Sequence, residues 1–231
     1  MSDICLVTLP HAGGSTLAFK KWKRLISSRI VNIEYPGHWI RLREPLLFSF
    51  DDLAEDVMQE IKKNIGNATD IVMFGHSLGA ILAWHIVEKI EQYDIKVRGL
   101  FLSGSQNPGS FPEPCILDAD SDEKILDLIG YRAEKINDTN DMYFRRDILP
   151  IVCSDLEICK SYKATKIKKD VNSFVFYGLD DVFTKYNEIL KWNEYTELNT
   201  IIGLNGGHLF FLDKSNSLLI STLINNYIDS L

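Results

Sequence analysis

The chain has 231 residues, of which 45% are hydrophobic, and its 25 basic and 32 acidic side chains give a net charge of −7 at pH 7. This size suits one domain with a single large core. The negative charge disfavours nucleic acid and anionic membrane surfaces as partners, and no run approaches the roughly eighteen apolar residues of a membrane span.

A strand pattern begins almost at the N-terminus, where residues 4–9 read ICLVTL. Asp3 followed at once by a strand argues against a secretory signal, so we expect a cytoplasmic protein. The four cysteines form no C-x-x-C pair and lack metal-ligand spacing. We therefore expect reduced thiols, no metal and no cofactor, and we expect a monomer.

The segment after this strand is a glycine-containing loop, PHAGGS, at residues 10–15. Its paired glycines let the main chain approach a ligand closely, and it lacks the lysine and the spacing of a phosphate-binding loop. A second strand pattern, IVNIEY, follows at residues 30–35 and ends in a loop that contains His38.

The stretch DIVMFGHSLGAILAWHIVEKI, residues 70–90, joins a strand to a helix through a serine. The apolar run at 71–74 is typical of a buried strand, and apolar residues after the motif recur at helical spacing. Gly75 and Gly79 flank Ser77 and remove side chains that would collide in a sharp turn. This pattern predicts the nucleophile elbow of an α/β-hydrolase, with Ser77 as the nucleophile.

An α/β-hydrolase has a mostly parallel sheet with helices on both faces, and we assign residues 1–106 and 172–231 to this core. Residues 107–171 break the strand-helix alternation, contain clustered prolines and turn helical and charged. We predict that they form a helical lid inserted into the single catalytic domain. Within it, the basic run Lys160 to Lys169 is either a solvated surface or a contact for an acidic carrier protein.

A nucleophilic serine needs a general base, and the chain has five histidines. His76 adjoins the serine and should point away, while His85 lies about 12 Å further along the helix. His11 and His38 precede the serine, whereas hydrolases of this fold carry the triad in the order serine, acid, histidine. His208, in the loop GGHLFFL, fits this order and is the predicted base.

The acid should lie between the serine and the histidine, at the end of another strand. Residues 172–183, NSFVFYGLDDVF, offer a strand, a glycine turn and two carboxylates. Asp181 stands at the usual G-x-x-D position after Gly178 and is the predicted acid. Asp180 remains the alternative, because a one-residue error in the turn would exchange the two.

Two backbone amides form the oxyanion hole in hydrolases of this fold. One belongs to the residue after the nucleophile, which is Leu78 here. The other comes from the loop after the first strand, where we assign it to Ala12. In that loop His11 is better explained as a loop-shaping residue than as a second base.

Five motifs in this order resemble the type II thioesterases over nearly the whole chain: LPHAGGS, YPGHWIRLREP, FGHSLGA, YGLDDV and GGHLFFL. The resemblance implies a free-standing hydrolase of nonribosomal peptide and polyketide assembly lines that uses Ser77, Asp181 and His208. Two departures stand out. The family loop more often reads P-G-R-G where this chain has His38, and a proline often follows the acid where it has Val182.

The resemblance also implies the substrate, an acyl group on the phosphopantetheine arm of an acyl or peptidyl carrier protein. Because the chain begins almost at its first strand, we expect this carrier to be a separate protein. Two alternatives stay open. One is a small-molecule carboxylesterase or lipase of the same fold, and the other is a non-catalytic binding protein, although such proteins usually lose a triad member.

Overall fold

The computed structural model of the protein describes residues 4–112 and 144–231, and its centre is a six-stranded sheet. The strand order is β2-β1-β3-β4-β5-β6, and every neighbouring pair is parallel. The strands are β1 (Ile4–Leu9), β2 (Arg29–Asn32), β3 (Asp70–His76), β4 (Lys96–Ser103), β5 (Lys169–Gly178) and β6 (Thr196–Leu204). All six carboxyl ends therefore lie at one edge of the sheet.

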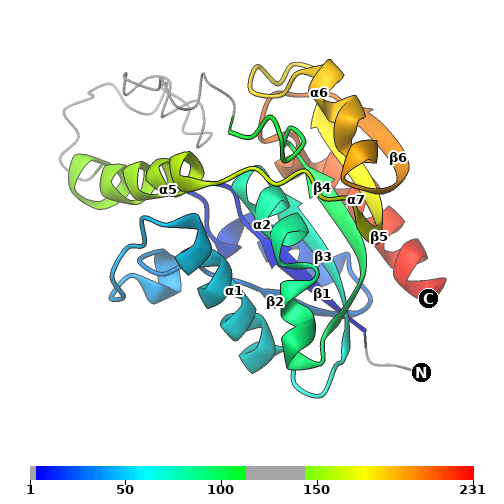
Figure 1. The fold of residues 1–231 in the computed structure, drawn as a ribbon, viewed down its shortest axis with the longest axis horizontal. Coiled ribbons are helices and arrows are strands. Elements are labelled where there is room, and N and C mark those ends of the chain that lie inside the picture. The colour runs from blue at the N-terminus through cyan, green and yellow to red at the C-terminus, as the bar shows by residue number, and fades with distance from the viewer. Residues whose placement is uncertain (1–3, 113–143) are drawn as a thin grey trace.

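Helical segments cover both faces of this sheet (Figure 1). They are η1 (Thr16–Arg24), η2 (Trp39–Arg41), α1 (Phe50–Asn64), α2 (Leu78–Ile86), η3 (Lys89–Tyr93), η5 (Phe144–Ile148), α5 (Leu149–Ser161), α6 (Tyr186–Leu190), η6 (Lys191–Glu194), η7 (Phe210–Leu212) and α7 (Lys214–Asp229). The predicted α/β-hydrolase architecture is confirmed. None of the helices in the described ranges is long and apolar enough to cross a membrane.

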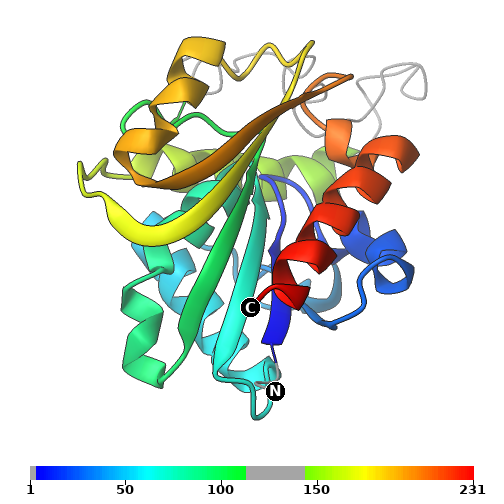
Figure 2. The same cartoon turned by 90° about the vertical axis from the view of Figure 1, so that its right-hand side faces the viewer.

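Two hydrophobic clusters, one on each face, hold the helices to the sheet. Along β3, Ile71 and Met73 belong to the cluster that includes α1 and α2, whereas Val72 and Phe74 belong to the cluster of η1 and α7. Figure 2 shows α7 in red beside the blue segment that follows β1. Because side chains of a strand alternate between faces, burial on both sides explains why the run is continuously apolar.

The loops after β1 and β3 leave the sheet side by side. Leu9 pairs with Gly75 at the carboxyl ends of these neighbouring strands. The chain runs outward from β1 to β2 and then returns to β3 on the other side of β1, so the strand order reverses here. In open α/β sheets ligands bind at such a switch point, which here receives both the loop at 10–15 and the turn at Ser77.

The predicted insertion is described only in part, since residues 113–143 lie outside the described ranges. Its helix α5 packs against α1 and the segment before it. The Ser161 hydroxyl accepts a hydrogen bond from the Phe50 amide at 2.8 Å, and the Ser154 hydroxyl donates to the Leu47 carbonyl. Helix α5 thus lies on the α1 side of the sheet.

Strand β5 begins at Lys169, three residues before the predicted start of the second core segment at residue 172. In the sequence, Lys169 ends a basic run that is typical of a solvated segment. In the structure its side chain is buried, with Nζ 4.8 Å from the centre of the Trp84 ring and 3.4 Å from a Glu88 carboxylate oxygen. A tertiary partner for the ammonium group allows a lysine to start a strand here.

Candidate active site

Ser77 occupies the turn between β3 and α2 with φ 55° and ψ −116°, angles that are rare for a residue with a side chain. Its amide donates to the Ser103 carbonyl of β4 at 2.8 Å, which holds the turn against the sheet. A Cβ atom at Gly75 would lie 2.1 Å from the Gly79 carbonyl oxygen, and one at Gly79 would lie 2.3 Å from that of Leu9. Both glycines are therefore needed for the close backbone approach at this elbow.

Asp181 and His208 follow the neighbouring strands β5 and β6. Nδ1 of His208 lies 2.9 Å from Oδ2 of Asp181, whose other oxygen accepts a hydrogen bond from the Phe183 amide at 2.9 Å. Both residues are buried. Asp180 is exposed, and its amide donates to the Gly206 carbonyl. The structure therefore brings Asp181 to the histidine, and the catalytic roles of the pair stay predictions.

Ser77 and His208 line one small cavity together with Gln106 and Phe183. Since a carboxylate only accepts hydrogen bonds, Nδ1 of His208 carries the proton toward Asp181, and Nε2 is left as an acceptor. This Nε2 atom is buried and has no hydrogen-bond partner among the described residues. The geometry thus leaves Nε2 of His208 without a partner from the described part of the chain in the cavity that Ser77 also lines.

Two further histidines are buried near this cavity. Nδ1 of His76 lies 2.9 Å from the Ser103 hydroxyl, and its ring stacks on Phe211 with centres 4.3 Å apart. Burial, and after it the proximity of His208, lowers the pKa of His76 well below its ordinary value and that of His11 to about 3. Both rings are therefore neutral at physiological pH and pack as polar aromatic groups.

The loop at 10–15, which carries the predicted oxyanion donor Ala12, is held on both sides of that residue. The Tyr35 hydroxyl donates to the Pro10 carbonyl at 2.8 Å. The Gly13 amide donates to Oδ2 of Asp155 in α5 at 2.6 Å. Ala12 lies buried between these two anchors, and Leu78, as the first residue of α2, has an amide with no intrahelical acceptor.

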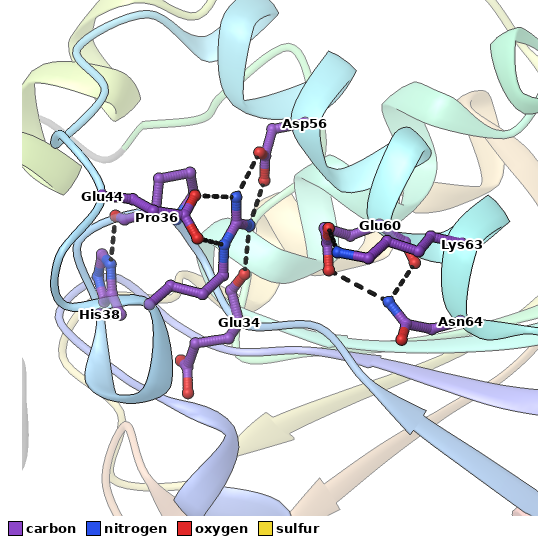
Figure 3. Close-up of polar contacts among 9 residues, drawn as sticks. Glu34, Pro36, His38, Glu44, Asp56, Glu60, Lys63 and Asn64 are labelled. Atoms are coloured by element: carbon purple, nitrogen blue, oxygen red, sulfur yellow. Dashed lines mark hydrogen bonds and ion pairs between the residues drawn. The ribbon is translucent and has the colours of Figure 1, made fainter.

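Asp155 is also paired with His38. Nε2 of His38 lies 3.0 Å from Oδ2 of Asp155. Nδ1 lies 3.0 Å from the Pro36 carbonyl oxygen, a contact drawn in Figure 3. Both partners only accept hydrogen bonds, so the two contacts together require a doubly protonated ring. Burial alone would lower the pKa of His38, but the charge of Asp155 and these hydrogen bonds outweigh it and raise the pKa. The two side chains form a buried ion pair.

Arg41 holds the loop that carries His38. Its guanidinium donates twice to Asp56 of α1, each time at 2.7 Å, and also to Glu44 at 2.9 Å and to the Glu34 carbonyl at 2.9 Å. In Figure 3 the dashed lines from Asp56, Glu44 and Glu34 meet at the end of one side chain of this loop. Arg41 thereby ties the loop that carries His38 to α1.

Sequence reasoning missed the roles of Asp155 and His38. Asp155 lies in LPIVCSDLEIC, residues 149–159, where an acid among apolar residues of a helix was a usable signal of a buried polar contact. Its partners lie 117 and 142 residues away, so no local pattern identifies them. Within the described residues, no group of three or more His, Cys, Asp or Glu side chains is arranged to hold a metal ion.

The fold and the site define a hydrolase with a serine at a nucleophile elbow, and comparison with known proteins gives its family. The model of the thioesterase domain family matches residues 5–226. Thioesterase TesA of Mycobacterium marinum is 28% identical over 222 residues, which cover 94% of this chain and 88% of TesA. This chain belongs to the thioesterase family and is an enzyme that hydrolyses thioesters.

Two solved structures resemble it over nearly their whole length. ClbQ from the colibactin NRPS/PKS pathway is 26% identical with a TM-score of 0.80, and the match covers 99% of this chain and 98% of ClbQ. BorB, a type II thioesterase from the borrelidin biosynthetic cluster, is 23% identical with a TM-score of 0.79, over 98% of this chain and 91% of BorB. The likeness to BorB shows that the two proteins share a fold.

Asp155→Asn should weaken both the fold and the enzyme. It leaves the buried His38 without a carboxylate and the Gly13 amide with a poorer acceptor, and breaking a buried ion pair in this way costs about 3–5 kcal/mol. Displacement of the loop at Ala12 should lower kcat on a small acyl thioester about tenfold to a hundredfold, with less effect on KM. Glu157→Gln, on the exposed side of the same helix, is the matched control and should change neither quantity.

The same variant gives a pH test of the ion pair. Folding raises the pKa of His38, so the contribution of the pair to stability is complete below the unfolded value of about 6.5 and is lost as the pH rises through the folded value. Denaturant unfolding of the wild type and Asp155→Asn should therefore give free energies that approach each other from pH 6 to pH 9. A constant difference would mean that His38 does not titrate with the pair.

Proposed function

We propose that this thioesterase is a type II enzyme that removes aberrant or stalled acyl groups from the phosphopantetheine arm of separate carrier proteins in the cytoplasm. The observation that carries the proposal is the buried hydrogen bond from His208 to Asp181, whose histidine shares a cavity with Ser77. The assembly-line origins of ClbQ and BorB support the choice of substrate, and colibactin synthesis is one candidate pathway.

In this mechanism Nε2 of His208 takes the proton of Ser77 as the serine oxygen attacks the thioester carbonyl. Asp181 accepts the Nδ1 hydrogen bond and stabilises the imidazolium that forms. The carbonyl oxygen becomes negative against the amides of Ala12 and Leu78, each of which lowers the barrier by about 3 kcal/mol. The carbon–sulfur bond then breaks, and the pantetheine thiolate takes the proton from His208 once it has left the carbonyl carbon.

The acyl group is left as an ester of Ser77. His208 next removes a proton from a water molecule, whose oxygen attacks this ester and forms a second tetrahedral intermediate. When that intermediate collapses, the serine oxygen recovers the proton and the free acid leaves. Because a thiolate leaves without the protonation that a peptide amine demands, thioesters suit this site better than peptides.

Incubation with a panel of acyl-loaded carrier proteins, followed by intact mass measurement, tests the proposal. We expect the carriers to lose the mass of the acyl group while they keep the phosphopantetheine arm. The enzyme with Ser77 changed to alanine is the control and should leave the acyl carriers intact. Rapid hydrolysis of small esters with no release from any carrier would instead favour the carboxylesterase alternative.

The sequence leaves two interpretations of the run Lys160 to Lys169, a solvated surface or a contact for an acidic carrier, and the ion pairs of the run bear on this choice. Lys160 pairs with Glu157 at 3.0 Å, Lys168 with Glu197 at 2.7 Å, and Lys166 with Glu194 at 3.9 Å. Lys169, as described above, is buried. Most of the positive charge of this run is therefore offset within the molecule, which makes it a poor contact for an acidic partner.

A further inference from the structure

A second group of basic side chains keeps its positive charges free of ion pairs with acidic side chains among the described residues. Lys20, Lys21, Lys23 and Arg24 of η1 and Lys214 at the start of α7 are all exposed. In the described part of the chain none of the five forms an ion pair with an acidic side chain. On a protein with a net charge of −7 they form a local region of positive potential.

Four of these side chains, Lys20, Lys21, Arg24 and Lys214, border a groove between η1 and α7. These two elements lie side by side in Figure 2. One hollow of about 480 Å³ runs from the loop residues His11, Gly13 and Gly14 to Lys20 and Lys21. A second hollow of about 630 Å³ continues from the same two lysines, and its lining includes Arg24, Leu25, Lys214 and Leu218. We call the two together the η1–α7 groove.

The lining of the η1–α7 groove combines apolar and basic side chains. Leu17 and Leu218 are 47% and 54% exposed, so each hollow presents an apolar side chain beside its basic ones. No acidic side chain lines either hollow within the described residues. One end of the groove is lined by the residues on either side of Ala12, the predicted oxyanion donor, and by Leu209, which follows His208. An elongated ligand with an anionic end and a partly apolar chain fits this arrangement.

We propose that the η1–α7 groove is the docking surface for the carrier protein. An acidic helix of the carrier meets the basic side chains of η1 and Lys214, and the phosphopantetheine phosphate lies near Lys20 and Lys21. From there the pantetheine chain follows the groove to the loop at 10–15. This assignment rests on the proposed function, since it needs an acyl group that arrives on a separate acidic protein.

Electrostatic complementarity mainly accelerates encounter and fixes orientation, and it weakens as salt is added. An enzyme that meets several carriers briefly benefits from such a contact, because steering raises the association rate without requiring tight binding. The ion-paired lysines of residues 160–169 cannot provide the same attraction, since a nearby glutamate cancels each charge at the distance of an approaching carrier. The location of the basic side chains of η1 near the loop at 10–15, and the lack of ion pairs for them among the described residues, both favour η1 over residues 160–169 as the docking surface.

Charge reversal on the two surfaces tests the proposal with matched variants. The first is the triple variant Lys20→Glu/Lys21→Glu/Arg24→Glu, and the control is Lys160→Glu/Lys166→Glu/Lys168→Glu, which changes the net charge equally. With an acyl-carrier substrate, the first should lower kcat/KM about tenfold or more and flatten its dependence on salt, and the control should have little effect. With an acyl-N-acetylcysteamine thioester, both variants should match the wild type.

The outcomes separate the docking surface from the proposed function. If the wild type hydrolyses the small thioester but no acyl carrier, the proposed function fails. If the wild type hydrolyses both and the η1 variant hydrolyses both equally well, the docking assignment is wrong. Equal slowing of both substrates by the η1 variant would also overturn it, because the side chains would then serve the active site or the fold. Slowing by the control alone would move the docking surface to residues 160–169.

Discussion

Ser77→Ala should abolish thioester hydrolysis while the fold remains intact. Without the hydroxyl, water must attack the substrate directly, and loss of a triad nucleophile in other serine hydrolases costs about 10⁶-fold in kcat. Stability should change little, because alanine can keep the strained backbone conformation of Ser77 and the hydrogen bond from its backbone amide to the Ser103 carbonyl. Thermal unfolding and steady-state hydrolysis of a small acyl thioester measure the two effects.

A fluorophosphonate probe gives a direct check, because it reacts covalently with an activated serine. We expect labelling of the wild type at Ser77, and Ser77→Ala should not react. Ser105→Ala is a suitable control, since Ser105 is buried, lines the same cavity and donates only to the Gln106 carbonyl. Labelling at another residue, or an active preparation that resists the probe, would contradict the assignment.

Asp181→Asn should reduce turnover by about 10⁴-fold, the effect of removing the orienting acid in other triads. An asparagine can donate a hydrogen bond from its NH₂ group to Nδ1 of His208. This contact favours the tautomer with the proton on Nε2, and that nitrogen can then no longer accept the serine proton. The backbone turn should persist, because asparagine still offers an oxygen to the Phe183 amide. Single-turnover kinetics with an acyl thioester would measure the loss of the acylation rate.

Asp180→Asn is the matched control, since it makes the same chemical change one residue earlier on an exposed side chain. It should cost less than a few-fold in turnover. If Asp180→Asn were the more damaging of the two, the acid would be Asp180 and the turn would rearrange in solution. If both were mild, neither carboxylate would orient the histidine.

The sequence by itself determined the features that depend on neighbours along the chain. The spacing of Gly75, Ser77 and Gly79 between a buried strand and a helix predicts the elbow, because a sharp turn needs small residues at fixed offsets. Helix geometry then excluded His76 and His85, and the order of serine, acid and histidine excluded the two histidines before Ser77, which left His208 as the predicted base. The parallel sheet was predictable for a similar reason, since continuous apolar runs that alternate with helices leave few other architectures.

Only the tertiary structure decided which distant side chains meet. The choice between Asp180 and Asp181 depends on how the turn after β5 faces the loop that follows β6. Asp155 anchors the loop at 10–15 through Gly13, a residue 142 positions away. Lys166 and Lys168 of the basic run form ion pairs with glutamates in and just before β6. Such contacts form only when packing of the sheet and helices brings distant elements together. The partners and energies of these contacts therefore cannot be inferred from any local sequence pattern.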